Sequence, residues 1–242
     1  MKKVIIVQAR MTSTRLPGKV LKEVCGKPLL AHLIARLKRV QNADQIVIAT
    51  TTNSTDEPIV TLCKQCAMDF YRGSEEDVLS RYYETAKEFS ADIIIRITSD
   101  CPVIDSKVIN KVIAFYMNNK DSCDYVSNVL SRTYPRGMDT EVFSFKVLQE
   151  AHREAEDEVE REHVTPFIHQ RPERYRCVNV PYDTDQSHHR WTVDTPEDLA
   201  LITKIFEALF PRKPAFGLED MLDVMDAHPE WRSINAHVRP KE

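Results

Sequence analysis

Long apolar runs are missing from this chain of 242 residues. No segment approaches the roughly 20 apolar residues that a membrane-spanning helix needs. The run that follows Met1-Lys2-Lys3 has four residues, Val4 to Val7, and is too short for the apolar core of a signal peptide. These absences predict a cytoplasmic protein with no membrane partner. Its cysteines are then expected to be reduced.

A strong net charge is also missing, because 33 basic and 37 acidic side chains leave a formal charge of −4. This balance argues against a nucleic-acid partner that needs a broad basic surface. Paired metal-binding motifs are missing as well. Cys63 and Cys66 form one C-x-x-C, but no second pair stands at the spacing of a zinc site. We interpret these cysteines as small apolar residues on one helical turn.

Glycine is nearly missing from the segment 4–19, which therefore matches neither G-x-x-x-x-G-K-[ST] nor G-x-G-x-x-G. The segment does contain an apolar run typical of a strand buried on both faces. A loop with Arg10, Arg15, Lys19 and three hydroxyl residues follows this run. Such groups suit the oxygens of a triphosphate, and ligands of open α/β sheets bind at the carboxyl ends of parallel strands. A solvated basic loop is the alternative that charge alone leaves open.

Strand and helix patterns alternate from the first strand to about residue 120. This rhythm predicts an α/β fold with a mostly parallel sheet, right-handed crossovers and helices on both faces. After the first strand, further strands are expected at 45–50, 69–71 and 92–98. The intervening helices are expected to begin at Pro28, Asp56, Ser74 and Asp105, the last three acting as caps.

The rhythm changes after residue 120. Strands are predicted at 124–128, 140–145 and 175–180, and helices at 147–159 and 161–170. We place a substrate-facing insertion or subdomain at about 129–187, within a single domain that spans residues 1–242. The primary fold then resumes with a strand at 190–194, a helix that begins at Thr195 and Pro196, and a helix near 218–226.

Two aspartates are predicted at strand ends on the same side of the sheet as the basic loop. Asp100 follows the strand at 92–98, and Asp194 ends the strand at 190–194. If these strands are parallel neighbours, the two carboxylates converge. Mg²⁺ is typically held by one or two carboxylates together with substrate phosphates. The alternative is that each aspartate is a helix cap or loop residue, but the pair beside the basic loop favours a magnesium site.

Five motifs resemble known cytidylyltransferases. Residues 9–19, A-R-M-T-S-T-R-L-P-G-K, resemble the amino-terminal signature A-R-x-x-S-x-R-L-P-G-K of the enzymes that activate sugar acids. The later segments resemble the spore-coat polysaccharide (SpsF-type) cytidylyltransferase family, which is related to CMP-keto-deoxyoctulosonate and CMP-sialic acid synthetases. These segments are R-I-T-S-D-C-P-V-I-D at 96–105, Y-P-R-G-M-D-T-E-V-F at 134–143, R-E-H-V-T-P at 161–166 and T-V-D-T-P-E-D-L at 192–199.

The resemblance covers nearly the whole chain and implies a nucleotide-diphospho-sugar transferase-like (Rossmann-like) fold. It implies transfer of CMP from CTP to a sugar or sugar-acid acceptor, with release of pyrophosphate, in surface polysaccharide or glycan biosynthesis. Mg²⁺ is the implied cofactor, and a homodimer built largely from residues 129–187 is the implied assembly. The apolar residues Val147, Leu148 and Ala151 agree with that interface. Cys101 replaces the residues that sugar-acid synthetases have after Asp100, so the acceptor stays open.

The resemblance also implies roles for individual residues. Arg15, Lys19 and Asp100 would be catalytic, and Asp100 and Asp194 would hold the metal. Apart from the resemblance, the predicted insertion itself supplies polar side chains that are candidates for binding the acceptor, namely Arg136, Asp139, Glu141, Arg161 and His163. A histidine of ordinary pKa suits a general base near neutral pH, and a structural or interface role for His163 is the alternative. The nucleotide-binding set comprises Gln8, Ala9, Arg10, Thr12, Ser13, Thr14, Arg15, Lys19, Arg72, Ser74 and Asp100.

Two other functions compete with this hypothesis. A nucleotide-sugar-dependent glycosyltransferase would need a D-x-D motif where this chain has Ser99-Asp100-Cys101. A non-catalytic nucleotide-binding protein belongs to a different class, and the intact basic and acidic motifs weigh against it.

Overall fold

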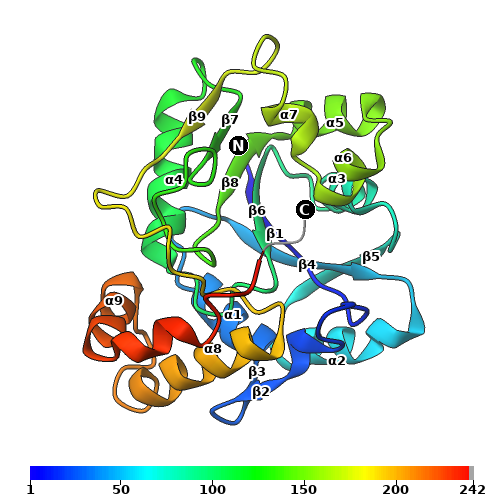
Figure 1. The fold of residues 1–242 in the computed structure, drawn as a ribbon. Coiled ribbons are helices and arrows are strands. Elements are labelled where there is room, and N and C mark those ends of the chain that lie inside the picture. Colours follow the sequence, from blue (N-terminus) through cyan, green and yellow to red (C-terminus); the bar gives the residue numbers. More distant parts are fainter. Residues whose placement is uncertain (240–242) are drawn as a thin grey trace.

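The computed structural model describes residues 1–239, and its central feature is a seven-stranded sheet in the order β5-β4-β1-β6-β8-β7-β9 (Figure 1). Strands β5, β4, β1 and β6 are parallel, β8 is antiparallel to β6 and β7, and β9 is parallel to β7. The expected mostly parallel α/β sheet is therefore confirmed. The strands are β1 (Lys3–Gln8), β4 (Gln45–Thr51), β5 (Asp69–Gly73), β6 (Ile93–Thr98), β7 (Tyr125–Ser127), β8 (Glu141–Ser144) and β9 (Cys177–Asn179).

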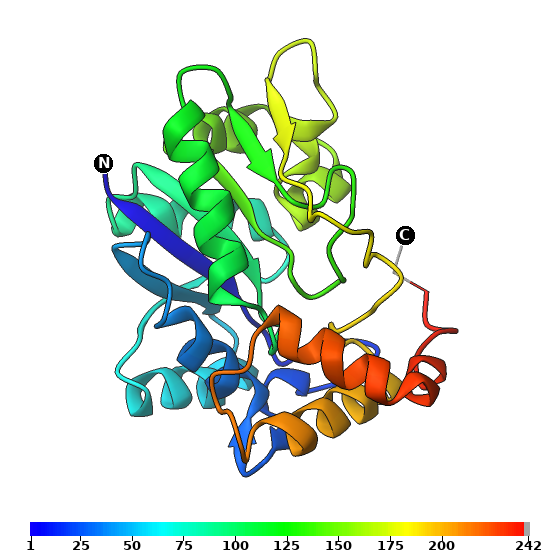
Figure 2. The same ribbon diagram turned by 90° about the vertical axis from the view of Figure 1, so that its left-hand side faces the viewer.

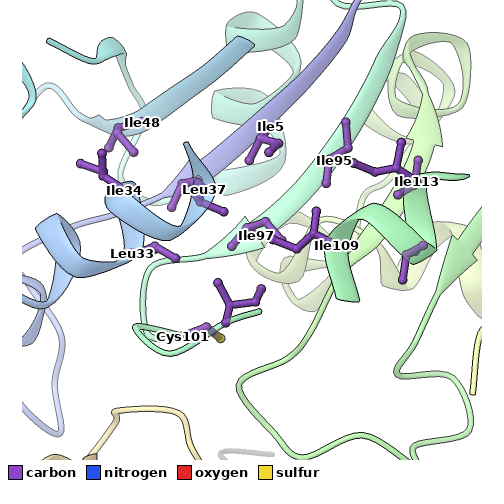
Figure 3. Close-up of a cluster of buried hydrophobic side chains, with 14 of the residues drawn as sticks. Ile5, Leu33, Ile34, Leu37, Ile48, Ile95, Ile97, Cys101, Ile109 and Ile113 are labelled. Carbon is purple, nitrogen blue, oxygen red and sulfur yellow. The ribbon is translucent and has the colours of Figure 1, made fainter. Parts of the chain in front are cut away.

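Helices cover both faces of this sheet. Successive side chains of β1 point to opposite sides, and each set packs against the helices on its own face. Ile5 and Val7 belong to a buried cluster with residues of α1, α2 and α4, part of which Figure 3 shows around Ile5. Val4 and Ile6 belong to a second cluster with residues of α3 and α5. The prediction that this strand is buried on both faces is confirmed. These helices are α1 (Leu29–Leu37), α2 (Glu57–Gln65), α3 (Val78–Glu88), α4 (Ser106–Asn119) and α5 (Phe145–Glu154).

A third buried cluster joins the two ends of the chain. Trp191 and the apolar faces of α8 (Pro196–Leu209) and α9 (Leu218–Ala227) pack with Leu16, Val24 and Leu29. Figure 2 shows these last helices, in orange to red, beside the blue amino-terminal segment. A short hairpin, β2 (Glu23–Val24) and β3 (Lys27–Pro28), lies in that segment and was not expected from the sequence. The short 3-10 helices are η1 (Lys19–Leu21), η2 (Ser54–Asp56) and η3 (Pro229–Ser233).

The strand expected at 190–194 is wrong. Only Arg190 makes a β-bridge, to Arg136, and the next residues leave the sheet direction. Gly137 directly follows Arg136 and has a φ of +104°, a conformation that favours glycine. The segment that contains Arg136 therefore turns away from residues 191–194 after the single Arg136–Arg190 bridge. Asp194 therefore lies on an irregular segment rather than at a strand end.

Three expected helix starts or lengths are also wrong. The helix expected at 147–159 ends at Glu154, because Ala155 is extended and Asp157 caps α6 (Glu158–His163) through Val159 N. The helix expected at 161–170 is correspondingly divided between α6 and α7 (Pro166–His169). Ser74 does not cap α3. Asp77 does so, by accepting a hydrogen bond from Ser80 N, and Ser74 Oγ accepts one from Asp77 N.

Residues 129–187 supply β8 and β9 to the main sheet as well as α5, α6 and α7. The boundaries of an insertion there stay a prediction. None of the helices within residues 1–239 combines the length and apolar character needed to cross a membrane.

Candidate active site

A cleft of about 420 Å³ lies where the loops after β1 and β6 meet the segments around Arg136 and Asp194. Of the predicted site residues, those that line it are Gln8, Ala9, Arg10, Ser13, Thr14, Arg15, Lys19, Asp100, Arg136, Asp139, His163 and Asp194. Loops from separate parts of the chain thus meet at the carboxyl ends of parallel strands, as open α/β sheets generally arrange their ligand sites.

The basic loop after β1 is anchored by a hydrogen bond to Asp56. Its fully buried carboxylate accepts hydrogen bonds from Met11 N at 2.8 Å and from the hydroxyls of Thr50 and Thr51. Asp56 stands at the N-cap position of α2, as predicted, but its carboxylate makes no capping hydrogen bond because these groups occupy it. The loop closes on itself through Gly18, whose N–H donates to Met11 O at 2.9 Å and whose φ is +65°. This closure brings Lys19 back toward the cleft.

Lys19 contacts both Asp100 and Asp194, the two aspartates that the sequence predicted to converge. Its ammonium lies 2.8 Å from Asp194 Oδ1 and 3.6 Å from Asp100 Oδ2. Asp100 Oδ2 and Asp194 Oδ1 therefore lie at most about 6.4 Å apart, although Asp194 is not on a strand. Burial opposes the charge on Lys19, but the two carboxylates outweigh it and raise the pKa of this residue. Burial likewise opposes the charge on Asp100, whereas Lys19 keeps the pKa of this carboxyl below its ordinary value.

Asp194 is also held in place by Arg190, in an ion pair that the sequence did not reveal. Arg190 Nη2 donates to Asp194 Oδ2 at 2.9 Å and to Asp198 Oδ2 at 2.9 Å, while its Nε donates to Asp198 Oδ1. Asp198 is fully buried and also forms the capping box of α8 with Thr195. Arg15 Nη2 lies 3.1 Å from Asp194 Oδ2 on the cleft side. Asp194 thus sits between three cations, and its position is set by α8.

The cleft also contains groups suited to a polar ligand, among them Arg136 and Asp139. Arg132 donates two parallel hydrogen bonds to Asp139, at 2.6 and 2.9 Å. Such a fork fixes the orientation of both groups. Arg136 lines the cleft beside this pair, and burial, followed by the nearby Arg132, lowers its pKa. His163 also lines the cleft.

Five predicted site residues do not line the cleft. Glu141 is buried and accepts hydrogen bonds from Arg96, Tyr125 and Thr165, because β8 turns its side chain into the sheet layer. The remaining four are committed to other partners. Arg161 pairs with Asp77 and donates to the carbonyls of His152 and Ala155. Arg72 donates to Thr51 O and Asn53 O and pairs with Glu57. Thr12 donates to Glu75, and Ser74 Oγ accepts a hydrogen bond from Asp77 N.

Several lining residues were missed as site residues. Those in the quoted motifs could have been found by their place near Asp100, Arg136, His163 or Asp194, whereas Val78 and Arg81 stand on α3 and Arg190 lies two residues before its motif. The missed residues are Val78, Arg81, Arg96, Thr98, Ser99, Cys101, Gly137, Glu162, Arg190 and Thr192.

The two carboxylates of the cleft suit Mg²⁺, but they are too few to complete its coordination. Asp100 and Asp194 offer carboxylate oxygens, the ligands that hard cations prefer, and both already face the positive charge of Lys19. Within residues 1–239 no group of three or more His, Cys, Asp or Glu side chains is placed to hold a metal. A bound Mg²⁺ would therefore need further oxygens from a phosphate substrate and water.

Similarity to known proteins agrees with this geometry. A family described as Cytidylyltransferase matches residues 4–221. The chain is 30% identical over 232 residues to the spore coat polysaccharide biosynthesis protein SpsF of Bacillus subtilis, covering 93% of this chain and 94% of that protein. Over 108 residues it is 32% identical to a 3-deoxy-manno-octulosonate cytidylyltransferase of Pelobacter propionicus, which covers 45% of this chain and 42% of that protein.

A solved structure of a cytidylyltransferase from Leptospira borgpetersenii is similar along its whole length. It has a TM-score of 0.92 and 31% sequence identity, and 100% of each chain is covered. The relationship to SpsF and to octulosonate cytidylyltransferases, expected from five motifs, is confirmed by whole-chain and partial matches, respectively. With its motifs, its sheet and its cleft in agreement, the chain belongs to the cytidylyltransferase family.

Proposed function

We propose that this protein transfers CMP from CTP to the hydroxyl of a sugar or sugar-acid acceptor. The observation that carries the proposal is the arrangement of Arg15 and Lys19 against Asp100 and Asp194 at the centre of one cleft. The acceptor oxygen attacks the α-phosphorus in line, the bond from that phosphorus to the bridging oxygen of the β-phosphate breaks, and pyrophosphate leaves. The hydroxyl proton passes to water or to His163, which lines the cleft.

The loop after β1 supplies the charge that such a transfer needs. Arg10, Ser13 and Thr14 line the cleft where they can bind phosphate oxygens, and Arg15 and Lys19 offset charge on the leaving pyrophosphate. Nucleotidyl transfer asks for little covalent work from the protein, so positioning and charge neutralisation carry the catalysis. The ion pairs of Lys19 and Arg15 with Asp194 hold these cations in place before substrate arrives.

Mg²⁺ is part of this proposal, with Asp100 and Asp194 as its protein ligands. When bound, the ion would neutralise phosphate charge and hold the triphosphate in one orientation. The residues of the chain do the rest. Lys19 is already shared by both carboxylates, and Arg190 holds Asp194 at the distance that this sharing requires.

A sugar-acid acceptor is supported by Arg136 and by the Arg132–Asp139 pair. A guanidinium suits a carboxylate, and a fixed carboxylate suits sugar hydroxyls. Because one relative is called a 3-deoxy-manno-octulosonate cytidylyltransferase and another a spore coat polysaccharide biosynthesis protein, we propose a role in surface polysaccharide or glycan synthesis.

The decisive experiment measures pyrophosphate release over CTP, UTP, ATP and GTP, each with a panel of sugar acids, sugars and sugar phosphates. We expect CTP with one acceptor class to give the highest turnover at subsaturating nucleotide, and mass spectrometry to show the acceptor joined to CMP. Lys19→Ala should lower turnover, and Lys22→Ala, a cation outside the cleft on the same segment, should not. CTP binding without pyrophosphate release from any pair would instead identify a non-catalytic nucleotide-binding protein.

The proposed homodimer rests on family resemblance. Val147, Leu148 and Ala151, which the sequence offered for the interface, are buried in the chain's own second cluster. The large apolar side chains still exposed in residues 129–187 are Leu130 and Val159, at 37% and 55%. Light scattering at micromolar concentrations should give the mass of two chains, and a monomer at every concentration would reject the dimer.

A further inference from the structure

A second cavity, of about 390 Å³, is separate from the catalytic cleft, since no residue within 1–239 lines both. We call it the Arg36 cavity. It is enclosed by α1, the start of α4 and the segment that leads into α9. Its aromatic and apolar walls come from Ile104, Val108, Tyr134, Tyr182 and Phe216.

The Arg36 cavity has an excess of positive charge. Its lining includes five basic side chains, Arg36, Arg39, Lys107, Lys111 and Lys213, and three acidic ones, Asp105, Glu219 and Asp220. Five cations against three anions leave a surplus of two positive charges.

The three acids are already engaged. Asp105 accepts from Lys107 N and Leu218 N, both at 2.8 Å, and Glu219 accepts from Tyr182 OH at 2.7 Å. Asp220 accepts from Gly217 N and pairs with Lys213 at 2.7 Å. Of the five cations, Lys213 alone has an ion pair within the described chain.

Arg36 is the buried member of this set, with 4% of its surface exposed. Its Nη1 donates to Phe216 O at 2.8 Å, and its guanidinium lies 4.0 Å from the centre of the Phe216 ring. Its Nη2 is buried and has no hydrogen-bond partner among residues 1–239. Burying a cation without an anionic partner is costly, so an anion that reached this guanidinium would be favoured.

We propose that the Arg36 cavity is a binding site for a small phosphate monoester whose phosphate pairs with Arg36 and Lys107 and whose apolar part lies against the aromatic wall. A phosphate monoester carries close to two negative charges at neutral pH, which matches the surplus in the cavity. Guanidinium groups bind phosphate with two donors at once, and Arg36 has an unused donor.

The position of this site relates it to the catalytic cleft. The loop from Asp100 to Asp105 lines the cleft at its first residue and the Arg36 cavity at its last. Tyr134 lines the cavity, and Arg136, two residues later, lines the cleft. A ligand at Arg36 would therefore contact both segments that position cleft residues.

The test is isothermal titration calorimetry of the whole chain with phenyl phosphate, inorganic phosphate and benzyl alcohol as probes. We expect phenyl phosphate to bind at least threefold more tightly than inorganic phosphate, because the latter leaves the aromatic wall unused, and benzyl alcohol not to bind detectably. Equal affinity for the two phosphates, or no binding of phenyl phosphate at millimolar concentration, would overturn the proposal.

Variants assign the site. Arg36→Met removes the guanidinium that lies over Phe216 and leaves an unbranched apolar side chain, and Lys107→Ala changes an exposed side chain, so the second variant tests the site even if the first does not fold. Each should weaken phenyl phosphate binding at least tenfold. Lys19→Ala and the exposed Lys64→Ala should leave it unchanged. Loss of binding in Lys19→Ala but not in Lys107→Ala would show that the probe binds in the catalytic cleft, and it would refute the assignment.

Discussion

Replacing Gly137 by alanine should damage both the stability and the activity of this protein. Gly137 has a φ of +104°, and a Cβ atom there would lie 2.6 Å from the carbonyl oxygen of Trp191. The unfavourable backbone conformation costs about 1–3 kcal/mol, and forcing an extra carbon into a packed contact costs about 1–3 kcal/mol more. Gly137→Ala should therefore lower the free energy of unfolding by about 2–6 kcal/mol.

Gly26→Ala is the matched control, because Gly26 also has a positive φ, +73°, but has nothing within 4 Å of the position of a Cβ. It should cost only the backbone term, about 1–2 kcal/mol. Urea unfolding of the two variants side by side separates the contact from the conformation. If Gly137→Ala lost no more stability than Gly26→Ala, the close approach to Trp191 would not be the constraint described here.

Gly137→Ala should also displace residues that line the cleft and so lower the activity. Gly137 lies between the cleft residues Arg136 and Asp139, and its neighbour Trp191 precedes Thr192, which also lines the cleft. A displacement of about 1 Å in groups that position a substrate typically costs about a hundredfold in rate. Pyrophosphate release by Gly137→Ala should fall by roughly that factor at a temperature where it is still folded, and Gly26→Ala should retain wild-type turnover.

Asp100→Asn and Asp194→Asn should each lower turnover about a hundred- to a thousandfold while circular dichroism shows an unchanged fold, since each keeps its shape and loses its charge; a loss below tenfold would contradict the role of these carboxylates. Burial opposes the charge of Glu141, but Arg96 outweighs it and keeps the pKa of this carboxyl below its ordinary value of 4.5. The stability that Glu141 contributes is therefore complete above about pH 4.5 and lost as the pH falls through the lower folded value. Urea midpoints measured from pH 7 to pH 3 should fall more steeply for the wild type than for Glu141→Gln, and parallel curves would argue against the effect. Asn235 is 4% exposed and donates to Asp198 Oδ1 at 2.8 Å, so Asn235→Ala should reduce the free energy of unfolding by about 1.5–3 kcal/mol in the same urea assay.

The parts of the site that could be predicted are those that local pattern and strand geometry determine together. The apolar run of β1 stops at Gln8, and the next residues must leave the sheet at its carboxyl end. The same holds for β6, which ends at Thr98, two residues before Asp100. Because β1 and β6 are parallel neighbours, the basic loop and Asp100 lie close together whatever the rest of the chain does.

Other predicted site residues lie away from the cleft because a charged side chain has a competing partner that the sequence does not reveal. Glu141 belongs to a motif, but the register of β8 places it beside Arg96 on β6. Arg161 was expected to face the acceptor, but α5 ends early and leaves carbonyls that its guanidinium satisfies. Either residue would suit a cleft chemically, and only the positions of neighbouring elements decide that neither lies there.

The sequence by itself determined the alternation of strands and helices, the burial of β1 on both faces and the placing of a basic loop beside Asp100. Hydrophobic period and strand direction act over short distances, so a single chain segment is enough to read them. Only the tertiary structure decided that Asp194 reaches the cleft from an irregular segment, held by Arg190 and Asp198 of the following helix. That position depends on ion pairs and on the packing of α8, which arise only when distant segments of the chain meet.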